Sequence, residues 1–145
     1  MVSKSVSSHL CIVQTLEVKP YELHSAAILT TLDTFAGMKQ MYIEMLQGRV
    51  VLEMPGVVII EMANRFIVEL YTEIAEIPAY LFENQRIVLG YQTDDIEEAY
   101  QNLLQAKYQI LCPVQQAGDC YSYFHYAAAD GQIYKICELN KNKHS

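Results

Sequence analysis

The sequence lacks most of the signals that mark a well-defined class of protein. It has no Trp, its four Cys residues show no C-x-x-C spacing, and its ten Lys and Arg residues form no run before the polar tail. A zinc knuckle needs closely spaced Cys residues, and nucleic-acid binding needs clustered basic side chains. We therefore expect neither in this chain. Cys112 and Cys120 flank a loop, and there we favour two thiols over a disulfide.

Long apolar runs and glycine-rich loops are also missing. No apolar stretch approaches the roughly 20 residues of a membrane span, and the opening MVSKSVSSHL is too polar for a signal peptide. We therefore expect a cytoplasmic protein that does not bind membranes. Gly48, Gly56 and Gly90 are isolated and no G-x-S-x-G motif occurs, so neither a phosphate loop nor a nucleophile elbow is predicted.

What the chain does contain is a repeated apolar pattern. Two stripes have the i, i+3, i+4, i+7, i+8 spacing of a helix face, and the second begins 58 residues after the first. Each stripe leads into a strand-like run, which indicates two copies of one unit. The residues of the two stripes are Met38, Met41, Tyr42, Met45 and Leu46, then Ile96, Ala99, Tyr100, Leu103 and Leu104. We expect Met38, Met41 and Met45 to pack in the core.

The pattern divides the chain into five parts. Residues 1–8 are predicted to be disordered, 9–72 form a first module with an extra N-terminal strand at 9–18, and 73–85 form a connector. A second module follows at 86–139, and 140–145 is a polar tail. We expect Asp33 or Thr34 to cap the first helix and Gly48 to end it, and Asp94 to cap the second helix, which runs to about Lys107.

Each module is therefore predicted to be a βαβββ unit. The expected strands are 26–32, 49–54, 57–62 and 65–72, then 86–92, 108–114, 121–127 and 132–139. Such units curl their strands and leave one face concave. The predicted fold is α+β, with two modules that form a curved mixed sheet around a concave pocket and helices on the outer face.

Three stretches of sequence resemble a known family. LGYQTDDIEEAYQNLLQAKYQI, followed by DGQIYKICEL, and the earlier LTTLDTFAGMKQMYIEMLQGRVV are similar to motifs of the vicinal oxygen chelate superfamily, over roughly residues 24–139. That superfamily includes glyoxalase I, extradiol dioxygenases and bleomycin-resistance proteins. The resemblance implies a homodimer that holds a small molecule between its modules.

The resemblance also implies where a divalent metal would bind. The ligand positions, on the first and last strands of each module, fall on Ala26, Glu69, Val88 and Lys135. Ala and Val donate no lone pair, and Lys brings a like charge. A register slip would add only His24, two residues before Ala26. We therefore expect no metal and no other cofactor.

A different use of these positions is an ion pair. If the mapping holds, Glu69 and Lys135 face each other on the pocket floor, and a buried carboxylate needs a partner. The alternative is that Lys135 extends to water while Glu69 is exposed at a strand end. We give the two interpretations equal weight.

The remaining candidate site residues come from strands that face the pocket. His125 is either a general base or an inert, hydrogen-bonded strand residue, and we favour the second interpretation because no nucleophile or acid partner is apparent. Glu69, His125 and Lys135 are the candidates for catalysis. The predicted pocket residues are His24, Ile28, Thr30, Glu69, Tyr71, Val88, Tyr121, Tyr123, His125 and Lys135.

The favoured function is a metal-free protein, similar to glyoxalases and bleomycin-resistance proteins, that binds a small organic molecule. One alternative is a metal-independent lyase, isomerase or other enzyme of the same fold. A metal-dependent glyoxalase or dioxygenase would follow if the ligand mapping is wrong, and an interaction module would follow if side chains close the pocket. Whether the modules pair within one chain or between subunits is left open.

Overall fold

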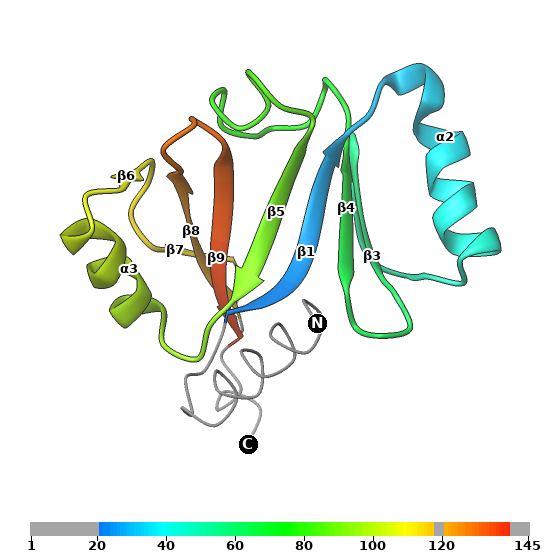
Figure 1. Cartoon of the computed structure of the whole chain (residues 1–145). Helices are drawn as coiled ribbons and strands as arrows, with labels where there is room; N and C mark the ends of the chain where they lie inside the picture. Colours follow the sequence, from blue (N-terminus) through cyan, green and yellow to red (C-terminus); the bar gives the residue numbers. More distant parts are fainter. Residues whose placement is uncertain (1–20, 118–120, 140–145) are drawn as a thin grey trace, which may run out of the picture.

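A computed structural model of the chain describes residues 21–117 and 121–139 (Figure 1). The predicted strand at 9–18, the N-terminus 1–8 and the tail 140–145 lie outside these ranges. The first module contains β1 (Glu22–Leu29), α2 (Leu32–Gln40), η1 (Met41–Met45), β2 (Arg49–Met54), β3 (Val57–Glu61) and β4 (Ile67–Tyr71). The second contains β5 (Ile87–Gln92), α3 (Ile96–Gln105), β6 (Gln109–Ile110), β7 (Gln115–Gln116), β8 (Tyr121–Ala127) and β9 (Ile133–Leu139).

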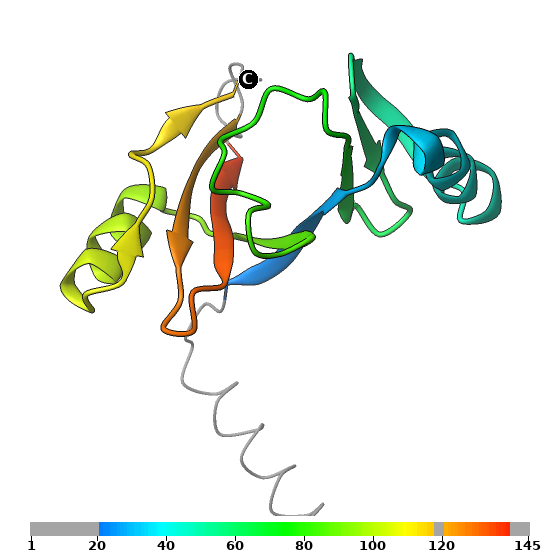
Figure 2. The same cartoon turned by 90° about the horizontal axis from the view of Figure 1, so that it is seen from above.

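The strands form one mixed sheet in the order β2-β3-β4-β1-β5-β9-β8-β6, and β7 also pairs with β8. The modules meet at an antiparallel ladder of β1 and β5, in which Ala27 lies opposite Val88. They are therefore paired within one chain. Seen from above, the sheet curves, with α2 and α3 on the outside at its two ends (Figure 2). The predicted α+β class and curved mixed sheet are confirmed.

Two apolar clusters join the helices to the sheet. Val58, Ile60, Val68 and Leu70 are buried beneath α2 and η1. A second cluster lies beneath α3, and its buried members are Ile96, Ala99, Phe124 and Ile136. Among the part of the chain that the structure describes, no helix is long and apolar enough to cross a membrane.

The first helix differs from its predicted form. Thr31 is the N-cap and accepts a hydrogen bond from the Thr34 amide, so the helix begins before Asp33 and β1 ends at Leu29. A π-helical turn then follows at Met41–Met45. Its wider turn changes which side chains face the sheet. Met38 packs against the core as expected, but Met41 and Met45 are 37% and 76% exposed, so the prediction that all three are core residues is wrong.

Gly48 has a different role from the predicted helix stop. The residue in the left-handed conformation is Gln47, with φ 62°. A Cβ on Gly48 would lie 2.5 Å from Cγ2 of Ile60. Gly48 therefore allows the chain to approach β3 closely after the helix has ended.

The second module departs from prediction at two points. Asp95, not Asp94, is the N-cap of α3, and its carboxylate accepts a 3.0 Å hydrogen bond from the Glu98 amide. The strand expected at 108–114 is replaced by the short strands β6 and β7 on either side of Pro113. Proline has no backbone N–H for a ladder, which explains the break.

Candidate functional site

The candidate site lies on the face of the sheet opposite the helices, called here the concave face. The register places Ala27 beside Glu69 in β4 and beside Val88 in β5. It also places Lys135 in β9 beside His125 in β8. Residues that pair across a ladder point to the same side, so the predicted Glu69, Val88, His125 and Lys135 share this face.

Glu69 and Lys135 form the predicted ion pair. Lys135 Nζ donates a 2.8 Å hydrogen bond to Glu69 Oε2, and the two residues are 8% and 9% exposed, respectively. The Tyr71 hydroxyl donates to the other carboxylate oxygen of Glu69 at 2.7 Å. Both oxygens therefore have a partner, and the alternative in which Lys135 extends to water is wrong.

The pair holds both groups in their charged forms. Burial by itself would raise the pKa of Glu69, but the Lys135 ammonium and the hydrogen bonds from Lys135 and Tyr71 lower it. Burial would likewise lower the pKa of Lys135, and the Glu69 carboxylate raises it instead. Burial and the Glu69 charge raise the pKa of the Tyr71 phenol, which therefore stays protonated and donates.

A row of aromatic side chains extends from the pair along β8. The Tyr121 ring centroid lies 5.2 Å from Lys135 Nζ, within cation–π range. Tyr121 and Tyr123 have ring centroids 5.9 Å apart, and those of Tyr123 and His125 are 5.4 Å apart. Planar rings and a cation thus lie side by side on the concave face.

His125 is buried and has partners from two loops. Its Nδ1 lies 3.0 Å from the Tyr80 hydroxyl and 3.9 Å from Cys112 Sγ. Burial first, and the Lys135 charge second, lower the pKa of His125 to about 4. The imidazole is therefore neutral at pH 7. Tyr80 belongs to the connector, whose aromatic content was the only sequence signal for this contact.

The start of β1 adds two more polar side chains. His24 lies at a register irregularity between Leu23 and Ser25, and burial and the Lys135 charge lower its pKa. Ser25 was not predicted. Its hydroxyl is buried, at 1% exposed for the residue, and has no hydrogen-bond partner among the described residues. A Cβ on Gly90 would lie 2.2 Å from Ser25 Oγ, so Gly90 makes room for this hydroxyl.

Two predicted pocket residues lie elsewhere. Ile28 packs against the cluster beneath α2, on the helix-facing side. Thr30 follows the end of β1, where its hydroxyl donates to the Tyr71 carbonyl at 3.0 Å. The expected metal position Ala26 pairs with Val68, a residue of that same cluster, so Ala26 faces the helices, whereas Ser25, Ala27 and Leu29 of β1 alternate onto the concave face.

These residues do not fit a divalent cation. Both oxygens of Glu69 are already hydrogen-bonded, and the Lys135 ammonium occupies the adjacent position. Among residues 21–117 and 121–139, no three His, Cys, Asp or Glu side chains are grouped closely enough to hold a metal. Cys112 and Cys137 are free thiols, and Cys120, the other residue of the predicted pair of thiols, lies outside the described residues.

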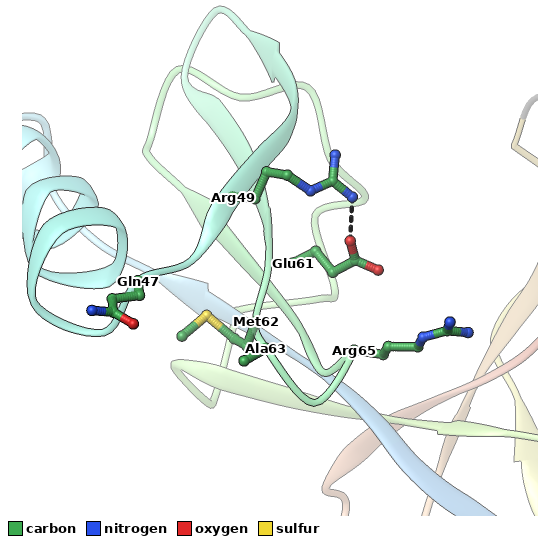
Figure 3. A pocket seen from close by; sticks show the side chains of 6 residues that line it. All are labelled: Gln47, Arg49, Glu61, Met62, Ala63 and Arg65. Atoms are coloured by element: carbon green, nitrogen blue, oxygen red, sulfur yellow. Dashed lines mark hydrogen bonds and ion pairs between the residues drawn. The ribbon is translucent and has the colours of Figure 1, made fainter.

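The first module also carries an open hollow of about 440 Å³. Figure 3 shows it at the junction of β2, β3 and the turn that follows β3. Arg49 Nη2 donates to Glu61 Oε1 beside it. The hollow is lined by Gln47, Arg49, Glu61, Met62, Ala63 and Arg65.

Several solved structures have a similar fold. A glyoxalase/bleomycin resistance protein/dioxygenase superfamily member from Vibrio splendidus is 15% identical, with TM-score 0.58 over 82% of this chain and 99% of that one. Methylmalonyl-CoA epimerase from Mycobacterium tuberculosis is 11% identical, with TM-score 0.67 over 89% of this chain and 98% of that one. A 2,2',3-trihydroxybiphenyl 1,2-dioxygenase from Sphingomonas wittichii is 14% identical, with TM-score 0.59 over 83% of this chain and 41% of that one.

No family model and no curated protein sequence matches the chain. At these identities the structural similarity establishes the fold. The protein therefore has the vicinal oxygen chelate fold.

Proposed function

We propose that the protein binds a small organic molecule on its concave face without a metal ion. The observation that carries this proposal is the 2.8 Å contact between Glu69 and Lys135, which puts a buried ion pair in the middle of that face. A protein of the same fold, methylmalonyl-CoA epimerase from Streptomyces coelicolor, is known in complex with 2-nitronate-propionyl-CoA. Small-molecule binding is thus within the repertoire of the fold.

The side chains around the pair indicate what it would recognise. Tyr121 and Tyr123 present rings that can stack on a planar group. Lys135 has N–H donors beyond the one given to Glu69, and the Ser25 hydroxyl lacks a partner among the described residues. A planar ligand with hydrogen-bond acceptors suits this combination.

A metal-independent enzyme is the second candidate. Glu69, Lys135 and His125 are three titratable groups in contact or in register on one face, and all three have shifted pKa values. Such clusters are common where protons are transferred. This candidate differs from the first in requiring that the bound molecule be converted.

A thermal-shift screen of small planar aromatic compounds, neutral, cationic and anionic, separates the candidates. A bound ligand raises the melting temperature because it stabilises only the folded state. Mass spectrometry of each stabilising compound after incubation then shows whether it is unchanged, as a binder requires, or converted, as an enzyme requires. A broad screen in which no compound raises the melting temperature would contradict both and favour an interaction module.

A pair of double variants tests whether the ion pair is involved. Glu69→Leu with Lys135→Met replaces both charges on the concave face and should abolish the stabilisation by each compound found. The matched control is Lys39→Met with Glu53→Leu, which removes an ion pair between exposed side chains. The control should retain the stabilisation, and equal loss in both variants would contradict binding at the concave face.

We also propose that the protein is a homodimer. β2 is the outer strand of the sheet, and Val51, Leu52 and Met54 on it are 42–50% exposed. An exposed apolar edge strand favours pairing with another chain. Sedimentation should give twice the chain mass for the native protein and the chain mass for Leu52→Lys, whereas a native monomer would contradict the proposal.

A further inference from the structure

Three charged side chains lie together at the edge of the first module. Arg49, Glu61 and Arg65 are called here the rim cluster, and all three project to the same side of the strands (Figure 3). Glu61 pairs with Ile67, and Ile67 pairs with Ser25. The rim cluster therefore belongs to the same face as Ser25 and the Glu69–Lys135 pair.

The charges of the rim cluster do not cancel. Arg49 donates to Glu61, which accounts for one positive and one negative charge. The Arg65 guanidinium has no hydrogen bond or ion pair with another described residue. The hollow of about 440 Å³ thus carries a net positive charge in a chain whose formal charge is −7.

The backbone of Arg65 points to a role for its side chain. Its φ is 71°, the left-handed region in which glycine is favoured and a long side chain is strained. The turn is held by the Asn64 side chain, which accepts a hydrogen bond from the Phe66 amide. A cationic side chain at a strained backbone position beside a hollow indicates a functional role, such as the binding of a charged group.

We propose that the rim cluster binds an oxyanion, a phosphate or carboxylate group, of the molecule held on the concave face. This inference rests on the proposed function, and it adds that the ligand is anionic at one end. A guanidinium binds such oxygens through paired, charge-assisted hydrogen bonds. Arg65 supplies a free guanidinium, and Glu61 competes with the oxyanion for Arg49.

The test uses inorganic pyrophosphate and citrate as separate probes, titrated calorimetrically into the full chain at low ionic strength. Pyrophosphate represents a phosphate group and citrate a carboxylate group. Arg65→Gly should weaken binding about tenfold, since a charge-assisted hydrogen bond is lost. Glu61→Gln should strengthen binding by a comparable factor, because it frees Arg49 and removes a repelling charge.

Lys107→Gly is the matched control. Lys107 also has a left-handed backbone, with φ 67°, and lies after α3 in the other module. Both glycine variants lose one positive charge and relieve the same backbone strain, so both should melt no lower than the native protein. Only Arg65→Gly should lose affinity for the probe.

Three results would overturn the inference. They are no binding of either probe to the native chain, native affinity in Arg65→Gly, or an equal loss in Lys107→Gly. Failure here is distinguishable from failure of the proposed function. If neither probe binds while aromatic compounds still raise the melting temperature, the rim-cluster inference is wrong and the proposed concave-face site is retained. If a probe binds while no compound raises the melting temperature, the proposed function is wrong and only the anion site at the rim cluster is retained.

Discussion

The two faces of the sheet differ in whether charged side chains are buried among the apolar ones. On the helix-facing side the buried residues of β3 and β4 that form the core are apolar, as Ile60, Val68 and Leu70 illustrate. On the concave face the same sheet buries the charged Glu69 and Lys135, next to a smaller apolar cluster of Ala27, Val88 and the connector residue Leu81. Val68, Glu69 and Leu70 are consecutive, so the contrast arises within one strand through alternation of side chains.

The contrast indicates different contributions to stability. Apolar burial contributes about 25 cal/mol per Å² of surface removed from water. A buried ion pair gains Coulomb energy but loses hydration, and well-packed apolar replacements are often neutral or stabilising. The apolar clusters should therefore provide most of the stability, chiefly on the helix-facing side, while the buried ion pair of the concave face is better explained by binding.

The largest expected effect is a cavity on the helix-facing side. Phe124 is fully buried, and its ring packs edge-on against Tyr100 with centroids 5.2 Å apart. Phe124→Ala should lower the free energy of unfolding by about 3–5 kcal/mol, measured in urea. Leu104→Ala, at an exposed position, is the control. A similar loss in both variants would contradict the assignment of this core.

The next largest effect is expected when only one member of the ion pair is replaced. Lys135→Met leaves the Glu69 carboxylate buried without its cation, and should lower the free energy of unfolding by about 3 kcal/mol. Adding Glu69→Leu should restore stability to about the native value or above it. Urea unfolding of both variants checks this, and a double variant less stable than the single one would show that the pair itself stabilises the fold.

The third effect is pH dependence from the concave face. The pKa of His125 is about 4 in the folded chain and 6.5 ordinarily, so the unfolded chain alone binds the proton between these values. Stability should fall as the pH is lowered from about 6.5 to about 4, by up to about 3 kcal/mol from His125. His125→Gln removes this part of the slope.

The pH dependence of stability also distinguishes the contribution of His125 from those of Glu69 and His24. Glu69 has an ordinary pKa of 4.5 that is lowered in the folded chain, so its contribution is lost only at more acidic pH. His24 also has a pKa lowered from 6.5, by burial first and the Lys135 charge second, so its contribution to stability likewise decreases below pH 6.5, but His24 is present in both proteins. Identical slopes for the native protein and His125→Gln would contradict the buried, neutral imidazole.

The smallest expected effect concerns Ser25. Its buried hydroxyl has no partner among the described residues, and an unmade hydrogen bond costs about 1–3 kcal/mol. Ser25→Ala should therefore raise the free energy of unfolding by about 1 kcal/mol. A loss of stability instead would mean that the hydroxyl is satisfied in solution, and thermal unfolding of the single variant decides between these outcomes.

Local patterns were enough to predict much of the fold. Alternation predicted β8 at 121–127, and the Pro55-Gly56 turn predicted β2 and β3 within one residue of their ends. The spacing of like patterns predicted two modules. The resemblance to a known superfamily brought Glu69 and Lys135 together, although 66 positions separate them.

Features that depend on pairing in three dimensions were missed. The π-turn at Met41–Met45 changes the helix phase, and no propensity marks it. The register irregularity in β1 at His24 depends on the pairing of β1 with β5, so the sequence alone does not reveal it. The resemblance therefore mapped the metal position to Ala26, one residue away from those of β1 that lie on the concave face. Tyr80 reaches His125 from a segment without periodic structure, so spacing could not predict that contact.

The measurement that tests the central claim most directly is the metal content of the purified protein. The claim is that the Glu69–Lys135 pair leaves no room for a cation on the concave face. Elemental mass spectrometry after incubation with Ni, Zn, Mn and Fe and removal of excess should find no stoichiometric metal, and none of these ions should raise the melting temperature. One tightly held metal per chain, lost in Glu69→Gln, would contradict the account and favour a metal-dependent enzyme.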